Sequence, residues 1–237
     1  MNDIEKLNDI IKNSKRIVFF GGAGVSTESG IPDFRSVDGL YNQKYKRNPE
    51  YMLSHTCFID EPVEFYKFFF DKMIFKNAKP NNCHKKLVEL EKNGKLSCII
   101  TQNIDGLHEM AGSKNVLNLH GCVNTLYCMN CGKKYMLNNI KHSGIPHCSC
   151  GGTLKPDVVL YEEALNDDIV NEAINQIEKC DTLIVGGTSL VVYPAAGLIR
   201  YFKGKNLVLI NRDVTPYDDI ATLVIRKNIG EVFKNIK

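Results

Sequence analysis

Five short segments of the chain are almost continuously apolar, a pattern typical of strands that are buried on both faces of a sheet. These segments are RIVFF (16–20), LSCII (96–100), TLIVG (182–186), NLVLI (206–210) and ATLVI (221–225). Between them, apolar residues recur at helical spacing, which predicts helices over 2–13, 82–92, 166–179 and 195–202. Strands that alternate with helices in this way predict an α/β fold built on a parallel sheet.

Two segments do not follow this alternation. Residues 36–80 are rich in Tyr, Phe and Lys and contain EFYKFFF (64–70) at helical spacing. We expect a small helical insertion there, with the aromatic side chains in its core. Residues 122–152 contain four cysteines in two close pairs and show little apolar periodicity.

The composition of the 237 residues is that of an ordinary globular protein, with 43% hydrophobic and 24% charged residues. A net charge of +3 gives no reason to expect a nucleic-acid or membrane partner. We interpret the basic cluster of Lys44, Lys46 and Arg47 as a solvated loop rather than a phosphate contact. The uncharged run from Thr182 to Ile199 contains a proline and three glycines, so we interpret it as a strand, a turn and a helix start rather than a membrane span.

Two cysteine pairs predict a zinc site. Cys128-x2-Cys131 and Cys148-x-Cys150 each place two thiolates on one tight turn, and glycines follow both pairs. Four protein ligands leave no position for water, so we expect the zinc to be structural, with His147 as a weaker alternative ligand. The remaining cysteines are expected to be buried packing residues, namely Cys57, Cys83, Cys98, Cys122 and Cys180.

The N-terminus is charged from Asp3 onward and lacks the pattern of a secretory signal. We therefore expect a cytoplasmic protein whose nine cysteines stay reduced.

The loop after the first predicted strand, GGAGVSTESGIPDFRS (21–36), begins like a dinucleotide-binding loop and then departs from it. Gly22 and Gly24 fit the pattern G-x-G-x-x-G, but Thr27 replaces its third glycine. No acidic residue follows about 20 positions later at the end of a second strand, where it would hold a ribose. Polar residues, among them Asn103 and Asp105, follow the next predicted strand. Because the carboxyl ends of parallel strands meet at one edge of a sheet, we expect the two loops to face the same crevice.

Six motifs then occur in the order found in one known family. GAGVSTESGIPDFRS, TQNIDGLHEMAG, LHG, the paired cysteines, KPDVVLYEE and GGTSLVVYPAAGLI together resemble the sirtuin family, the NAD-dependent protein deacylases. The resemblance implies a Rossmann-like NAD-binding domain made of residues 1–35, 81–121 and 153–237. It also implies a small lobe made of the helical insertion (36–80) and the zinc-binding module (122–152). NAD and an acyl-lysine protein or peptide would meet between the two.

The cofactor contacts that the resemblance implies are Ala23, Gly24, Thr27, Phe34, Arg35, Gln102, Ile104, Asp105, Gly187, Thr188, Ser189, Asn211 and Ile229. The loop over 23–27 would approach the pyrophosphate, Phe34 would shield the reactive sugar and Arg35 would help to hold the phosphates. Asp105 would bind the nicotinamide carboxamide together with Ile104. We expect Asp33 to anchor the loop rather than to act in the reaction.

His120 and Asn103 are the catalytic residues that the resemblance implies. Asn103 would orient the ribose and a water, and His120 would be the general base that takes a proton through the ribose hydroxyls. A histidine suits this role because its unperturbed pKa, about 6.5, lies close to the working pH. The products would be nicotinamide, O-acetyl-ADP-ribose and free lysine. His120 could instead be a structural histidine, and Asp105 could cap a helix that starts at Gly106.

The peptide contacts that the resemblance implies are Val158, Val159, Leu160 and Tyr161, which would pair with the substrate as an added strand. The chain departs from the family at this place, because Tyr161-Glu162-Glu163 stands where Phe-Gly-Glu is usual. The additional side chain puts the substrate preference in doubt. Residues 36–80 show no clear Tyr-x-x-Arg pair, which favours an acetyl or another apolar acyl group over an acidic one.

Two other functions use the same features of the sequence. An ADP-ribosyltransferase or NAD glycohydrolase would use the same cleft with a different acceptor. A zinc-ribbon binding module would hold a ligand without any chemistry. The presence of Asn103, Asp105 and His120 together favours an enzyme.

Overall fold

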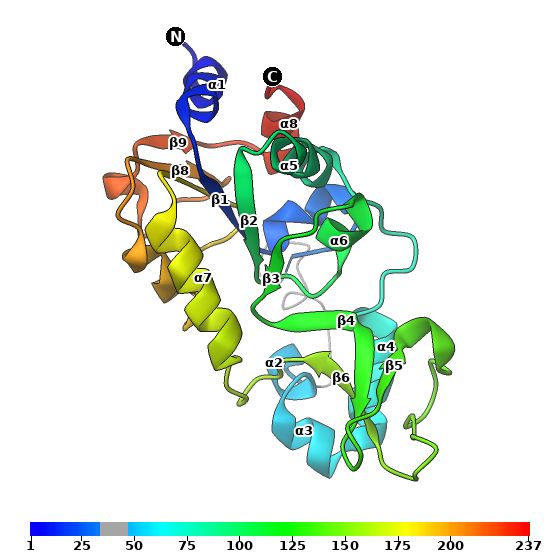
Figure 1. Ribbon diagram of the computed structural model, residues 1–237. Coiled ribbons are helices and arrows are strands. Elements are labelled where there is room, and N and C mark those ends of the chain that lie inside the picture. Colours follow the sequence, from blue (N-terminus) through cyan, green and yellow to red (C-terminus); the bar gives the residue numbers. More distant parts are fainter. Residues whose placement is uncertain (34–46) are drawn as a thin grey trace.

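The structure is a computed structural model, and it describes residues 1–33 and 47–237. Its main sheet is parallel, with the strand order β3-β2-β1-β7-β8-β9 (Figure 1). The strands are β1 (Ile17–Gly21), β2 (Leu96–Thr101), β3 (Val116–Asn118), β7 (Thr182–Gly186), β8 (Asn206–Ile210) and β9 (Leu223–Ile225). After β1 the chain adds β2 and β3 on one side of it and then crosses over to add β7, β8 and β9 on the other side. Ligands of such sheets bind at the carboxyl ends of the strands, beside the point where the strand order reverses. The predicted α/β fold is confirmed.

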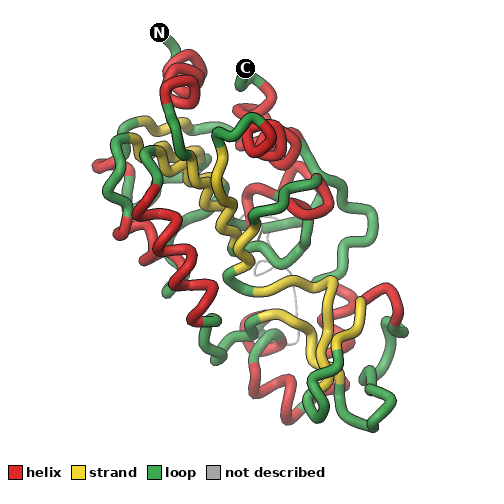
Figure 2. The backbone as a smooth tube through the Cα atoms, in the orientation of Figure 1, coloured by secondary structure: helices red, strands yellow, loops and turns green. Residues whose placement is uncertain are grey.

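Neighbouring side chains of β1 belong to two different cores, because side chains alternate across a strand. Phe19 lies in the core that includes side chains of α1 (Asp3–Asn13), α5 (Asn82–Lys92) and α8 (Ile229–Lys234). Phe20 lies in the core on the other face, with side chains of α7 (Asp167–Lys179) and the 3₁₀ helix η5 (Ala195–Tyr201). The sheet is therefore covered on both faces, as its apolar strands predict, and Figure 2 shows the helices on either side of the strands.

A second, antiparallel sheet has the strand order β5-β4-β6. It consists of β4 (Gly121–Cys128), β5 (Lys134–Met136) and β6 (Leu154–Val158), and beside it lie α2 (Pro49–Met52), α3 (His55–Asp60) and α4 (Pro62–Lys72). Phe65, Tyr66 and Phe69 of α4 are buried together with Val123 and Val158 of this sheet. The prediction that the aromatic residues of 64–70 form a core is confirmed.

Some elements differ from the prediction. Residues Ala195–Tyr201 form a 3₁₀ helix and not an α-helix. The pattern does not predict β3, because this edge strand has only three residues, all half-buried. The other short elements are α6 (Leu107–Ala111) and the 3₁₀ helices η1 (Ala23–Val25), η2 (Thr27–Ser29), η4 (Leu137–Asn139) and η6 (Asp218–Ile220).

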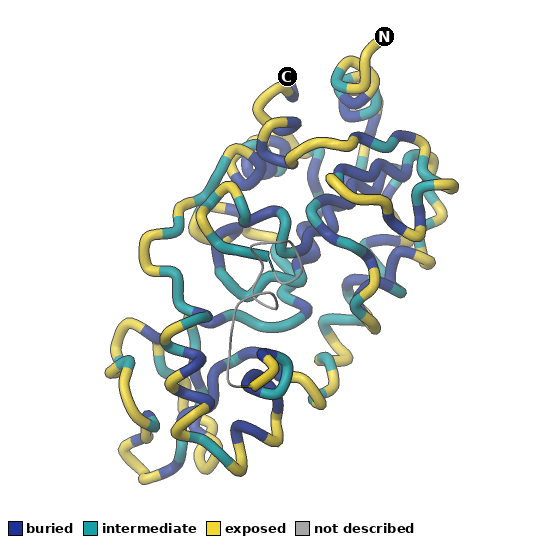
Figure 3. The backbone as a smooth tube through the Cα atoms, turned by 180° about the vertical axis from the view of Figure 1, so that it is seen from behind, coloured by how far each residue is buried: buried dark blue, intermediate teal, exposed yellow. Residues whose placement is uncertain are grey.

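The uncharged run that ends at Ile199 folds as β7, a loop and the first part of η5, as predicted. Figure 3 shows buried residues along the strands of the main sheet and also in the part of the chain around the second sheet. Within residues 1–33 and 47–237, no helix has the length and hydropathy that a membrane span needs.

Candidate active site

The loop after β1 lies against the loop after β7, at the carboxyl edge of the main sheet. The nitrogen of Gly24 donates to the carbonyl oxygen of Gly187 at 2.8 Å. This approach requires glycine, because a Cβ on Gly24 would lie 2.8 Å from the Cα of Gly187. A Cβ on Gly22 would similarly lie 2.7 Å from the Cβ of Thr188. Gly24, Gly187 and Thr188, all predicted cofactor residues, are thus brought together.

Ser26 joins the loop that begins at Gly22 after β1, called the glycine loop, to the polar segment 102–105 after β2. Its Oγ donates to Asp105 Oδ2 at 2.6 Å and accepts from Asn103 Nδ2 at 3.1 Å. Nearby, Gln102 Nε2 donates to Thr188 Oγ1 at 3.1 Å. Three loops far apart in the sequence therefore meet, as the ends of parallel strands predict. No role is predicted for Ser26 from the sequence, although this residue lies inside the first motif.

Asp105 serves two segments at once. One carboxylate oxygen binds Ser26, and the other accepts from the backbone nitrogen of Leu107 at 2.9 Å, at the start of α6. Gly106 is the N-cap of α6, so Asp105 does not occupy the predicted N-cap position, although its carboxylate satisfies the first N–H of the helix and also contacts the glycine loop. Burial raises the pKa of Asp105, while the hydrogen bonds from Ser26 and Leu107 oppose this effect.

Asn81 fixes the opposite side of the glycine loop. Its Nδ2 donates to the carbonyl oxygen of Val25 at 2.7 Å and to Ser29 Oγ at 3.0 Å. Its Oδ1 accepts from the nitrogen of Cys83 at 2.9 Å and so caps α5. This residue is not among the predicted ones; the available signal is an asparagine directly before the predicted helix 82–92.

His120 lies between the polar segment and the second sheet. Its Nδ1 lies 2.8 Å from the carbonyl oxygen of Gln102. Because a carbonyl oxygen only accepts, Nδ1 carries the proton, and Nε2 has the lone pair of the neutral ring. Burial lowers the pKa of His120, and the hydrogen bond to Gln102 partly offsets this. The neutral form that a general base needs is therefore favoured.

The remaining cofactor candidates lie along the same edge. Thr27 Oγ1 donates to the carbonyl oxygen of Gly24 at 3.1 Å. Asn211 follows β8, next to β7. The side chain of Ile229 covers the end of β7, since its Cδ1 occupies the space that a Cβ on Gly186 would need. Ala23 and Ser189 continue the loops after β1 and β7.

The segment that ends the glycine loop is described as far as Asp33. Its carboxylate lies 3.6 Å from the guanidinium of Arg212, in the loop after β8, which agrees with an anchoring role. Phe34 and Arg35 lie outside the described residues. Ile104 accepts a backbone hydrogen bond of 2.9 Å from Val123 of β4, which ties the polar segment to the second sheet.

The predicted peptide segment continues from β6. Val159 donates its backbone N–H to the carbonyl oxygen of His120 at 2.9 Å. Tyr161 lies beside the connection between α2 and α3, donating to Leu53 and accepting from His55, both at 3.0 Å, and it forms a parallel bridge there. The segment is thus held between the candidate base and the helices beside the second sheet.

The four predicted metal ligands converge in the second sheet. The Sγ atoms of Cys128 and Cys150 are 3.4 Å apart, and those of Cys131 and Cys148 are 3.7 Å apart. Their ligand atoms all lie within 4.8 Å of one another, and His147 does not belong to the group. Tetrahedral zinc with bonds of about 2.3 Å places sulfur atoms about 3.8 Å apart. The four thiols therefore fit zinc.

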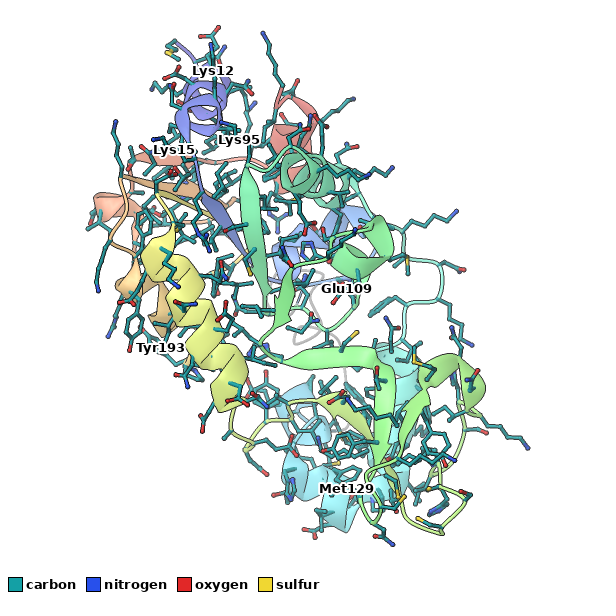
Figure 4. The ribbon with its side chains drawn as sticks, in the orientation of Figure 1. Lys12, Lys15, Lys95, Glu109, Met129 and Tyr193 are labelled. Atoms are coloured by element: carbon teal, nitrogen blue, oxygen red, sulfur yellow. The ribbon has the colours of Figure 1, made fainter. Side chains whose placement is uncertain are left out.

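The cysteine group is remote from His120. His120 directly precedes β4, and Cys128 is the last residue of that strand. In Figure 4, Met129, which follows Cys128, lies at the far end of β4 from Glu109 of α6. A metal held by these cysteines supports the structure of the second sheet.

The comparisons with known proteins agree with this geometry. The sequence model of the Sir2 family matches residues 22–194. The chain belongs to the Sir2 family. The predicted resemblance to sirtuins is thereby confirmed.

Sir2 relatives are similar over their whole length. The NAD-dependent protein deacetylase of Clostridium acetobutylicum is 56% identical, over 100% of this chain and 98% of the relative. That of Clostridium perfringens is 58% identical, over 98% of each. Among solved structures, a Sir2 variant with a deacetylated p53 peptide and 3′-O-acetyl ADP-ribose has a TM-score of 0.88, at 38% identity over 99% of this chain and 97% of that one. A Sir2 homologue in complex with NAD has a TM-score of 0.87, at 41% identity over 97% of this chain and 90% of that one.

Proposed function

We propose that this Sir2 chain is an NAD-dependent protein-lysine deacetylase whose reaction takes place where the loops after β1, β2 and β7 meet. One observation carries the proposal. The hydrogen bonds Ser26–Asp105 and Gln102–Thr188 join the three loops, and Gln102 also holds His120. The products are nicotinamide, O-acetyl-ADP-ribose and free lysine.

The described residues fit NAD as the co-substrate. Hydrogen bonds within the chain use the N–H groups of Gly24, Val25 and Ser26, so we assign the phosphate contacts of this loop to Ala23 and Thr27. Bound NAD supplies the sugar carbon that accepts the acyl oxygen. We assign the remaining contacts to Phe34, Arg35, Gln102, Ile104, Asp105, Gly187, Thr188, Ser189, Asn211 and Ile229, together with the backbone at Gly24.

His120 is the proposed general base. Its Nδ1–H is held by the carbonyl of Gln102, so Nε2 is the atom that receives a proton from the ribose hydroxyls. Asn103, which is fixed by Ser26, orients the ribose and a water. The hydrogen bond from Val159 to the carbonyl of His120 couples the peptide segment Val158–Tyr161 to the base.

We further propose the two-part organisation that the sequence implies. The NAD-binding domain comprises residues 1–35, 81–121 and 153–237, and the small lobe comprises 36–80 and 122–152. In the small lobe, Cys128, Cys131, Cys148 and Cys150 hold one structural zinc. The described cysteines are all free thiols, which suits a reducing compartment such as the cytoplasm. We expect acyl-lysine proteins as partners and no direct nucleic-acid binding.

One assay separates this function from its alternatives. The protein is incubated with NAD and acetyl-, succinyl- or long-chain-acyl-lysine peptides, and nicotinamide and deacylated peptide are followed by mass. We expect equal amounts of both from the acetyl peptide and none without a peptide. Nicotinamide release that does not depend on acyl-lysine would instead indicate an NAD glycohydrolase or ADP-ribosyltransferase.

A further inference from the structure

Glu162 has an unusual backbone conformation beside the peptide segment. Its φ is 74°, and Leu190 is the other non-glycine residue at positive φ in the described part of the chain. A side chain is strained in this left-handed region, whereas glycine is not. Such strain persists where surrounding contacts enforce it. The Sir2 pattern usually has glycine at this place, in Phe-Gly-Glu, whereas this chain places a charged side chain there.

The carboxylate of Glu162 accepts two hydrogen bonds from the first turn of α3. Its Oε2 accepts from the backbone nitrogen of Thr56 at 2.9 Å and from Thr56 Oγ1 at 2.7 Å. The same residue pair therefore forms two hydrogen bonds across 106 positions of sequence. Both bonds, together with the nearby His55, lower the pKa of Glu162.

The next residue points to different partners. Glu163 Oε2 accepts from Lys155 Nζ at 3.0 Å and from the backbone nitrogen of Leu160 at 2.9 Å, and its Oε1 lies 2.9 Å from His55 Nδ1. Lys155 is buried and also donates to the carbonyl oxygen of Val158 at 2.9 Å. Glu163 and Lys155 thus hold the peptide segment from within, while Glu162 ties its end to α3.

We propose that Glu162 is a positioning residue for the acyl-lysine peptide: its bonds to Thr56 fix the end of Val158–Tyr161 against α3. This inference rests on the proposed function. The bridge between Tyr161 and residues 53–55 sets the direction of the segment, and the Glu162–Thr56 bonds prevent the turn after it from opening. The chain accepts backbone strain at Glu162 and gains a preordered peptide-binding edge.

Replacing Glu162 by glycine tests what its hydrogen bonds to Thr56 contribute, without leaving a strained side chain behind. Glu162→Gly removes the backbone strain together with the two hydrogen bonds to Thr56, so the variant folds, while the peptide segment Val158–Tyr161 becomes mobile. We expect KM for the acetyl-lysine peptide to rise roughly threefold to tenfold, with KM for NAD and kcat nearly unchanged, because the lost contact lies at the far end of the segment and Val159 keeps its hydrogen bond to the carbonyl of His120. Melting temperature and circular dichroism report whether the variant is folded.

Three further variants identify the contact responsible. Glu162→Gln keeps an oxygen that accepts from Thr56 and should retain the wild-type peptide KM. Thr56→Ala removes one of the two bonds and should give a smaller rise, which Thr56→Ser should reverse. Adding Thr56→Ala to Glu162→Gly should cause no further rise, because both changes break one contact.

The proposal would be overturned by a wild-type peptide KM in Glu162→Gly, or by an equal rise in the KM for NAD. A loss of peptide binding in Glu162→Gln as large as in Glu162→Gly would also overturn it. The charge of Glu162, rather than its hydrogen bonds to Thr56, would then be responsible for peptide binding. Failure of the proposed function is distinct, since the wild-type protein itself would then release no deacetylated peptide.

Discussion

The hydroxyl of Ser26 donates a hydrogen bond of 2.6 Å to the carboxylate of Asp105. These residues stand 79 positions apart, in the loops after β1 and β2. Asp105 also accepts from the first N–H of α6, and Ser26 also accepts from Asn103, so Ser26 connects the glycine loop to one residue assigned to NAD binding and one assigned to catalysis.

Ser26→Ala should weaken NAD binding roughly tenfold, because it leaves the partly buried carboxyl of Asp105 without one partner and releases the glycine loop. Isothermal titration calorimetry with NAD measures the effect. Ser97→Ala is the matched control, since Ser97 Oγ donates to the carbonyl of Ile17 at 3.0 Å, near the amino ends of the strands. Equal NAD affinity in the two variants would contradict the role of Ser26.

Asn81→Ser should also weaken NAD binding, by about threefold to tenfold, while α5 keeps its cap. Serine is as good an N-cap as asparagine but cannot reach both Val25 and Ser29. Calorimetry gives the affinity, and far-ultraviolet circular dichroism checks the helix. If NAD affinity falls only in proportion to lost helix content, Asn81 acts through α5 alone.

The buried pair His84 and His108 predicts sensitivity to acid. Their ring centroids lie 4.7 Å apart, and burial lowers the pKa of His84 to about 4 and of His108 to about 3. The unfolded chain binds protons at these sites below about pH 6.5 and the folded chain does not. Their contribution to stability is therefore complete above about pH 6.5 and declines as the pH falls, towards about 4 for His84 and about 3 for His108.

Each of these histidines should add up to about 1.4 kcal/mol per pH unit to the loss of unfolding free energy between about pH 6 and pH 4.5. His108→Gln should flatten this slope by that amount, whatever its stability at neutral pH. Urea titrations at several pH values measure the slope. His147→Gln, at an exposed position, is the control, and equal slopes in the two variants would show that His108 is not responsible.

The cysteine group predicts one zinc per chain. Cys148→Ser should lose the metal and lower the melting temperature, whereas Cys122→Ser should retain it; metal analysis and thermal denaturation test both. Replacing zinc by cobalt should leave kcat within about twofold, because a closed four-thiolate site takes no part in the chemistry. A large change in kcat with a folded cobalt protein would place the metal in the reaction.

The sequence predicts the sheet well because its strands are buried on both faces and so read as unbroken apolar runs. It predicts the metal ligands because spacing alone confines two thiols to one turn. Residues that act through distant partners are harder to recognise. Ser26 lies inside a motif and Asn81 directly precedes a predicted helix, but only the fold reveals that their side chains cross between loops.

The second sheet escapes prediction for a related reason. β4 and β6 pair across the cysteine module, and β4 is partly exposed along its length, so it shows no continuous apolar run. Glu162 shows the same limit at a single residue. The loss of the family glycine is visible in the sequence, but the left-handed turn and its bonds to Thr56 are not.

His120 is proposed to act as a base where the three loops meet, and kcat/KM for an acetyl-lysine peptide in His120→Ala tests this role most directly. Calorimetry with NAD is run on the same preparation to show that the site is intact. We predict a fall of about 100-fold or more with NAD affinity retained, the usual effect of removing a general base. A value within about twofold of wild type, with NAD still bound, would contradict the account.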